Sequence, residues 1–215
     1  MPDDLDFDIK SIMYSDEVIR DKADEFRGEY WQEDTLPIDI ELIAERMGLD
    51  LIPVAHLKQQ CDMVASVVPN CKEMYIDLET WNAPNQEPFL RFSVAHEIAH
   101  VILHAPLLEW FASQNLPSIR EWGQMVQQQS QEPRIVLLEK AAHEFAGRVL
   151  VPIQKLEDAF NAALVKCEGV DMSEWNPDTV RAYLANDIYR DFGVSRQALE
   201  IRLRKERFWS NHRKS

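Results

Sequence analysis

The spacing of apolar residues along the chain predicts a mainly helical protein with one short region of strands. Phe92, Ala95, Ala99 and Ile102 recur at steps of three, four and three residues, which places them on one face of a helix over residues 89–104. The same periodicity predicts further helices over residues 16–31, 38–47, 135–150, 153–166, 177–191 and 195–208.

A different pattern lies between the helices predicted at residues 38–47 and 89–104. Residues 51–55, 63–68 and 74–78 are short, rich in β-branched side chains, and separated by turn-forming residues such as Pro69 and Asn70. We interpret them as a small antiparallel sheet. The sequence therefore predicts an α+β fold, in which a small antiparallel sheet packs against a mainly helical domain.

The composition favours one domain. The chain has 215 residues, of which 46% are hydrophobic, which is enough to form a buried core. Only 6 residues are glycine, so flexible Gly-rich linkers are absent. Residues 106–133 follow neither period, and their aromatic and Gln-rich content suggests a lid or partner surface. We expect an acidic disordered N-terminus at 1–15, a single domain at 16–208 that includes a C-terminal helical hairpin at 177–208, and a tail at 209–215.

The charge of the chain restricts its partners. Lys and Arg number 23 against 37 Asp and Glu, which gives a net charge of −14. Such a surface repels phosphate backbones and anionic lipid, so direct binding to nucleic acid or to a membrane is not favoured. No apolar run reaches the length of a membrane span, and the first residues lack the basic start of a secretion signal. Three cysteines predict reduced thiols and a cytoplasmic location.

The most informative stretch is His96-Glu97-Ile98-Ala99-His100. Residues four apart on a helix lie about 40° apart around its axis and about 6 Å apart along it. His96 and His100 therefore offer two imidazoles to one point, an arrangement that Zn²⁺ accepts. Glu97 can hold a metal-bound water and take its proton. The alternative, a pair of surface histidines, is weakened because the pair lies beside the apolar stripe.

A catalytic zinc site needs a third protein ligand. His104 continues the series but lies about 12 Å along the helix from His96, so we expect it to support the site rather than bind the same ion. Pro106 occupies the position of the third metzincin histidine. The downstream helix offers Glu139, which could complete a two-histidine, one-glutamate site, with His143 bonding to a ligand histidine. Alternatively, Glu139 is a solvated charge.

Two segments together resemble the ImmA/IrrE family of zinc metallopeptidases. They are Arg91-Phe-Ser-Val-Ala-His-Glu-Ile-Ala-His-Val-Ile-Leu-His104 and Glu139-Lys-Ala-Ala-His-Glu-Phe-Ala-Gly-Arg-Val-Leu-Val-Pro152. Residues 36–48 and 192–203 resemble the family as well. The resemblance implies a zincin-like, gluzincin-type fold, zinc bound by His96, His100 and Glu139, and Glu97 as catalytic base. Ala99 replaces the glycine usual in the family, and His143 replaces its usual Asn or Asp.

The resemblance also implies a function. Family members cleave helix-turn-helix transcriptional repressors, often encoded nearby, in stress-response and mobile-element regulation, or act as toxin-like partners of such repressors in toxin–antitoxin settings. We therefore expect a cytoplasmic zinc endopeptidase with a specific protein substrate. The alternative is a non-proteolytic regulatory or toxin component that binds a repressor or antitoxin. Tyr75, His104 and His143 are candidates for stabilising the oxyanion.

The C-terminal segment permits a third interpretation, a DNA-reading helix-turn-helix over residues 177–208. The competing account is a helical hairpin packed on the protease, whose charges form a solvated face, and the net charge of −14 favours it. The basic residues at issue are Arg196, Arg202, Arg204, Lys205, Arg207, Arg213 and Lys214.

Overall fold

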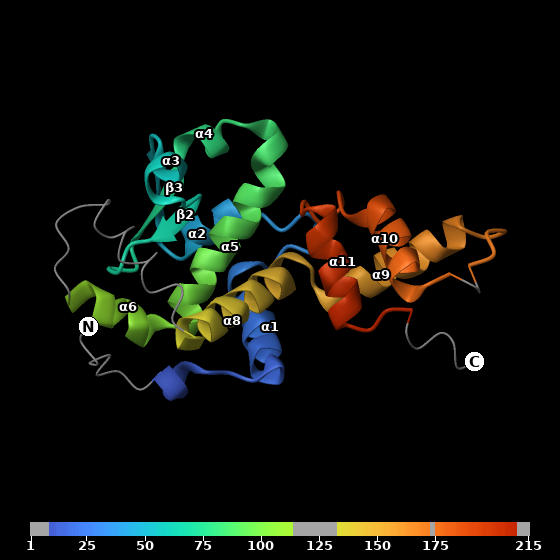
Figure 1. Cartoon of the computed structure of the whole chain (residues 1–215), viewed down its shortest axis with the longest axis horizontal. Helices are drawn as coiled ribbons and strands as arrows, with labels where there is room; N and C mark the ends of the chain where they lie inside the picture. Colours follow the sequence, from blue (N-terminus) through green and yellow to red (C-terminus); the bar gives the residue numbers. More distant parts are fainter. Residues whose placement is uncertain (1–8, 114–132, 173–174, 210–215) are drawn as a thin grey trace.

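The computed structural model of the protein describes residues 9–113, 133–172 and 175–209 (Figure 1). Most of the interval from residue 106 to 133 that the sequence left unassigned lies outside them. The elements in chain order are η1 (Ile9–Ile12), α1 (Asp16–Tyr30), α2 (Ile40–Arg46), β1 (Asp50–Val54), α3 (Leu57–Cys61), β2 (Ala65–Val67), β3 (Glu73–Asp77), α4 (Leu78–Trp81), η2 (Pro84–Gln86), α5 (Glu87–Leu103), α6 (Ala105–Ser113), α8 (Pro133–Leu150), α9 (Ile153–Lys166), α10 (Pro177–Ile188) and α11 (Arg196–Lys205).

The expected α+β class is confirmed, and the sheet is mixed rather than wholly antiparallel. The strand order is β1-β3-β2, with β2 antiparallel to β3 and β1 parallel to it. The antiparallel prediction for β1 is wrong because no hairpin turn joins β1 to β2. Helix α3 lies between them, flanked by His56 and Asp62 in the left-handed region at φ 60° and 56°. The chain therefore enters β2 on the far side of β3.

Helices α5 and α8 form the centre of the molecule, and α5 makes its most extensive helix contact with α8. Ala95 and Ala99 of α5 and Ala142 and Ala146 of α8 are fully buried. Small side chains at these positions let the two helices approach closely. Of the predicted α5 stripe, Ala95 and Ala99 face the core, whereas Phe92 and Ile102 are half-buried. The segment from His96 to His100 lies against α8.

Helix starts follow the capping residues. Ser15 caps α1 by accepting a hydrogen bond from Val18 N, as the sequence predicts. The second helix begins at Ile40 instead of Ile38, because the Asp39 carboxylate accepts hydrogen bonds from the first free N–H groups of α2.

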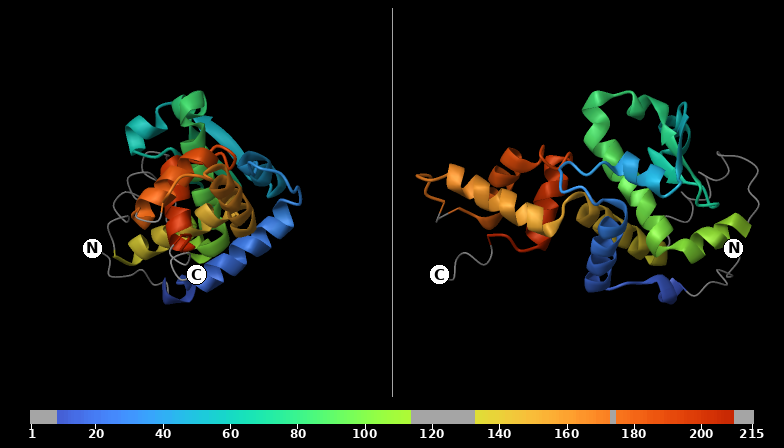
Figure 2. Two further views of the ribbon diagram at one scale, coloured as in Figure 1. Left: turned by 90° about the vertical axis from the view of Figure 1, so that its right-hand side faces the viewer. Right: turned by 180° about the vertical axis from the view of Figure 1, so that it is seen from behind.

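Helices α9, α10 and α11 lie on the side of α8 away from the sheet (Figures 1 and 2). Phe160, Leu184 and Leu199 of these helices belong to the same buried cluster as Ile19 of α1 and Ile98 of α5. The apolar core is therefore continuous from the first helix to the last. No helix in the described ranges is long and apolar enough to cross a membrane.

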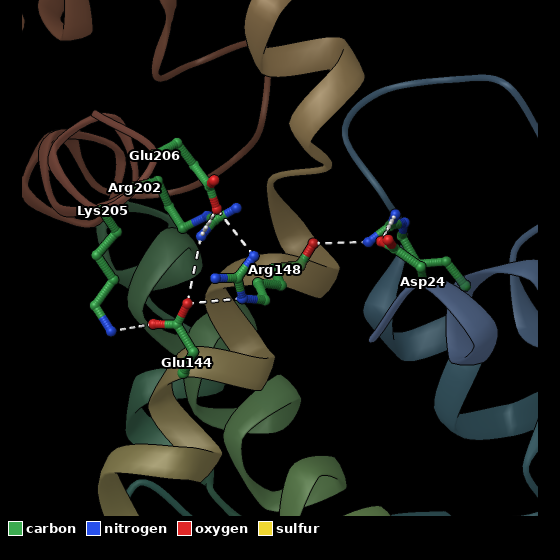
Figure 3. A network of polar contacts seen from close by, with 7 residues as sticks. Asp24, Glu144, Arg148, Arg202, Lys205 and Glu206 are labelled. Carbon is green, nitrogen blue, oxygen red and sulfur yellow. Dashed lines mark hydrogen bonds and ion pairs between the residues drawn. The ribbon is translucent and has the colours of Figure 1, made fainter. Parts of the chain in front are cut away.

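A buried ionic network, which we call the α8–α11 network, joins those two helices (Figure 3). Its members are Glu144, Arg148, Arg202, Lys205 and Glu206. Arg148 Nε lies 2.7 Å from Glu144 Oε1, Arg148 also pairs with Glu206 at 2.9 Å, and Arg202 pairs with Glu206 at 3.0 Å. Lys205 donates to Glu144. The expected solvated face is therefore wrong for Arg202, which is only 3% exposed.

Candidate metal centre

The two motif histidines project from the middle of α5 toward α8. Their Nε2 atoms lie 3.1 Å apart. Glu139 of α8 brings Oε2 to 3.0 Å from His96 Nε2 and Oε1 to 3.4 Å from His100 Nε2. Within the described residues these three form a group whose ligand atoms all lie within 4.8 Å of one another. The structure thus brings together the three residues that the sequence nominated.

The spacing of this donor set fits a tetrahedral zinc ion. Ligand atoms about 2.0–2.1 Å from zinc lie about 3.3 Å from each other at tetrahedral angles. The separations of 3.0, 3.1 and 3.4 Å between His96, His100 and Glu139 are close to that value. In addition, two neutral imidazoles that face each other through Nε2 need a proton or a cation between them. Two nitrogens and a carboxylate are also the donors of known catalytic zinc sites.

The pKa values describe how these groups share charge. Burial lowers the pKa of His96 to about 4, although its hydrogen bond to Glu139 opposes this. Burial also lowers the pKa of His100, but the bond to the Glu139 carboxylate outweighs it and the net shift is upward. For Glu139, burial raises the pKa, and the two histidines outweigh it and lower the pKa. An ionised Glu139 between two imidazoles is the charge state that metal binding requires.

Glu97 turns away from Glu139 and toward the sheet. Its Oε2 accepts a hydrogen bond of 2.9 Å from Val67 N of β2. Burial raises the pKa of Glu97 to about 7, against the lowering effects of His100 and of the Val67 N–H. Glu97 therefore lies between α5 and β2, with its Oε2 bonded to Val67 N and no hydrogen bond to its other carboxylate oxygen from the residues that the structure describes.

His104 supports His100 from behind. Its Nδ1 lies 3.0 Å from His100 Nδ1, and the ring is fully buried. Burial, followed by the charge of His100, lowers the pKa of His104 to about 3. A neutral His104 can accept the Nδ1 proton of His100, which leaves the Nε2 lone pair of His100 free for a cation at the point where His96, His100 and Glu139 converge. The orienting bond expected from His143 is thus made by His104.

His143 is exposed at the edge of the centre. Its Nδ1 lies 2.9 Å from the Glu139 carbonyl oxygen, one turn back on α8. Its ring lies 4.4 Å from that of His96, edge to face. His96 Nδ1 has no hydrogen-bond partner in the described part of the chain, so His143 does not orient it. Because the carbonyl can only accept, His143 Nδ1 carries the proton and Nε2 is unprotonated in the neutral ring.

Comparison with known families matches residues 80–204, more than half of the chain, to Peptidase_M78, described as the IrrE N-terminal-like domain. The chain belongs to this family. Its membership confirms the resemblance to ImmA/IrrE proteins and identifies the fold as that of a metallopeptidase family. The match includes α5, α8 and α11 and begins after the three strands. A comparison with curated proteins finds no match.

Tyr75, one of the residues that the sequence suggested for stabilising the oxyanion, is not part of the metal centre. It belongs to the central strand β3, opposite Ser66 and Ile52. No hydrogen bond joins it to the three converging residues in the described structure. Of the oxyanion candidates, only His143 is both exposed and in contact with a converging residue, because His104 is buried behind His100.

No pattern in the sequence indicated Val67 as a partner of Glu97. Ser66 N and O pair with Tyr75 in the antiparallel ladder, and Val68 N donates to Glu73 O. Because the backbone groups of alternate residues in a strand face opposite edges, Ala65 and Val67 present theirs to the edge of β2 that does not pair with β3. The short β-rich run at residues 63–68 was visible in the sequence, but the strand order that puts this edge beside α5 was not.

Proposed function

We propose that the protein is a zinc-dependent endopeptidase that cleaves one specific intracellular protein. The observation that supports it most strongly is the convergence of His96, His100 and Glu139 from two helices beside the acid Glu97. A zinc ion held there would lower the pKa of a water molecule and polarise a peptide carbonyl.

Glu97 serves as the general base in this proposal. Its Oε2 is fixed by Val67 N, so the other oxygen is available to a water molecule on the side of the histidines. Apolar surroundings raise the pKa of Glu97 to about 7, which suits a group that takes a proton from water and returns it to the leaving amine near neutral pH. Deprotonated Glu97 is held close to the reacting atoms by the strand.

The edge of β2 that does not pair with β3 is the proposed docking line for the substrate backbone. Extended peptides add to sheet edges by main-chain hydrogen bonds. Val67 N already donates to Glu97, so the N–H and C=O of Ala65 and the C=O of Val67 are the groups of this edge that would pair with a substrate. Glu97 marks the point where the edge meets the centre. A substrate strand at this edge would bring a peptide bond beside the converging ligands.

We infer that the substrate is a helix-turn-helix repressor or an antitoxin in the cytoplasm, by the resemblance to ImmA/IrrE proteins. The contacts of α11 favour this over direct DNA reading. Arg196, Arg202, Arg204 and Lys205 pair with carboxylates of the protein itself, and Arg202 is buried. A recognition helix needs its cations free for phosphates.

Co-expression with the repressor encoded next to the gene tests the proposal. The wild type should cut the repressor, whereas Glu97→Gln should retain zinc and lose cleavage by about 10²–10⁴-fold. Glu87→Gln is the matched control, because it makes the same change at an exposed position about 15 Å further back along α5.

Two results would contradict the proposed chemistry. Full activity of Glu97→Gln excludes this residue as the base. A stable, uncut complex between the wild type and the repressor supports the non-proteolytic alternative instead.

A further inference from the structure

A groove of about 970 Å³ runs along α8 from the metal centre to α11. Its walls come from four parts of the chain: the start of α1 with the residues before it, the start of α5, one face of α8, and α11. Glu139 and His143 line it from α8, and Arg202 and Lys205 line it from α11. A volume of this size accommodates several side chains of a peptide.

Large apolar side chains are exposed in this groove. Met13, Phe89, Leu137 and Ile201 are 45%, 48%, 44% and 41% exposed, and all four line it. They come from four segments that are far apart in the sequence. Exposed apolar side chains scattered singly are ordinary, but a group gathered in one concave surface indicates a binding site for a protein or peptide.

The groove is continuous with the metal centre. Glu139 faces His96 and His100 on one side and contributes to the groove wall on the other. The exposed ring of His143 contacts His96 and also lines the groove. A chain that occupies the groove therefore passes the converging ligands, which favours the substrate itself as occupant over an unrelated ligand.

The charges that line the groove favour a peptide with an acidic residue. Lys205 and Arg202 are already paired with Glu144 and Glu206. Lys140, which directly follows Glu139, lines the groove, is exposed, and pairs with no carboxylate of the described residues. The one carboxylate in the walls outside these pairs and the metal centre is Asp16, in the first turn of α1, where the helix dipole offsets it. The groove thus presents a free cation on a protein of net charge −14.

We propose that the groove binds the part of the substrate that flanks the cut bond, and that it selects an apolar stretch with one acidic residue paired to Lys140. The inference rests on the proposed peptidase function and specifies its substrate class. The apolar side chains of the substrate contact Phe89, Leu137 and Ile201, while the β2 edge holds the backbone nearer to Glu97.

A binding measurement tests the groove separately from the chemistry. The zinc-loaded Glu97→Gln protein is used to select ligands from a displayed library of random 12-residue peptides. Selected peptides are then labelled, and their affinity is measured by fluorescence anisotropy. We expect enrichment of apolar peptides with one Asp or Glu, and a loss of affinity of about tenfold on Leu137→Gln or Ile201→Gln, since each removes part of an apolar contact.

The charge and its control give two further readouts. Lys140→Gln should reduce the preference for the acidic peptide over its Gln counterpart by about threefold to tenfold, and Lys140→Glu should reverse it. Val165→Gln is the matched control: Val165 is 64% exposed on α9, does not line the groove, and should leave affinity unchanged. Circular dichroism of each variant confirms that it is folded.

The outcomes separate the two proposals. If the selected peptides bind as expected but the wild type cuts none of them, the groove stands and the peptidase function fails. If Leu137→Gln and Ile201→Gln cut a protein substrate at the same rate as the wild type, the function stands and the groove assignment fails. Absence of any enriched peptide overturns the groove as well. Concentration-dependent dimers that Leu137→Gln abolishes would assign the groove to a second copy of the chain.

Discussion

Successive turns of α8 place two carboxylates among groups from other helices, with different results. Glu139 meets His96 and His100, two imidazoles whose Nε2 atoms face each other. Glu144, five residues later, meets Arg148, Lys205 and Arg202, which carry permanent positive charge (Figure 3). The α8–α11 network already contains the cations that its carboxylates need, whereas the charge at the metal centre is complementary to a cation from solution.

This difference separates a structural carboxylate from a functional one. Burial raises the pKa of Glu144, but Lys205 and the two arginines outweigh it and lower the pKa. Glu139 is shifted in the same direction by its histidines. A lowered pKa alone therefore does not identify a site. The partners do, because imidazoles can exchange a proton for a metal ion and guanidinium groups cannot.

The largest expected effect comes from disrupting the α8–α11 network. Glu144→Ala leaves Glu206 as the one carboxylate for the three cations of the α8–α11 network. Removal of one partner from a buried ion group costs about 3–5 kcal/mol. The free energy of unfolding in urea should fall by that amount. Glu157→Ala on α9, an exposed glutamate, is the control and should change it little. Equal stability of Glu144→Ala and the control would remove the network as a stabilising feature.

The second effect concerns the metal side. Zinc at about 100 times its dissociation constant should raise the free energy of unfolding of the wild type by about 2.7 kcal/mol. It should raise that of Glu139→Ala far less, because one of the three ligands is missing. Thermal unfolding with and without zinc measures both. A zinc effect of the same size in Glu139→Ala and the wild type contradicts the proposed ligand set.

Glu97, beside the metal centre, and Glu144, in the α8–α11 network, should also respond to pH in opposite ways in the metal-free protein. The raised pKa of Glu97, about 7, means that the folded state holds its proton longer than the unfolded state. The contribution of Glu97 to stability is therefore present below about pH 4.5 and lost as pH rises to about 7, on the order of 1–3 kcal/mol, and Glu97→Gln should abolish this loss. The lowered pKa of Glu144 acts oppositely, so its contribution is present above the unfolded pKa and lost as pH falls.

Unfolding curves of the wild type, Glu97→Gln and Glu144→Gln at pH 4 to 8 measure these slopes. If Glu97→Gln leaves the decline above pH 4.5 unchanged, the decline has another source and the buried acid is assigned wrongly.

The smallest effect probes the close contact of α8 and α11. A Cβ at Gly147 would lie 3.2 Å from Arg202 Cδ, so Arg202 would have to shift within the α8–α11 network. Alanine at Gly28 of α1 would meet nothing within 4 Å. Gly28→Ala should stabilise the protein by about 0.5–1 kcal/mol through helix propensity. Gly147→Ala should stabilise the protein by about 1 kcal/mol less than Gly28→Ala, because the new Cβ displaces Arg202. Urea unfolding of both variants measures the difference, and an equal gain in stability would show that Arg202 moves aside without cost.

Local geometry explains what the sequence predicted well. The pair His96 and His100 follows from the pitch of one helix, and the capping of α1 by Ser15 follows from its own side chain. The pairing of Glu139 with them depends on two helices about 40 residues apart in the sequence. The sequence offered Glu139 as a candidate ligand on the downstream helix, and the likeness to a family then assigned it as the third ligand.

What the sequence missed depends on long-range packing. The direction of β1 was wrong because α3 replaces a hairpin turn. The support of His100 by His104, rather than of a ligand by His143, depends on which ring is buried. The charge pattern of α11 looked like a solvated face, but Arg202 is buried because Gly147 lets the two helices approach. None of these features has a period or a motif.

Diffraction from zinc-soaked crystals at the zinc absorption edge tests the central claim most directly. The account predicts one strong anomalous peak per chain, about 2.0–2.2 Å from His96 Nε2, His100 Nε2 and a carboxylate oxygen of Glu139. A fully occupied zinc peak elsewhere in the chain, with these three side chains unbound in an active protein, would contradict it.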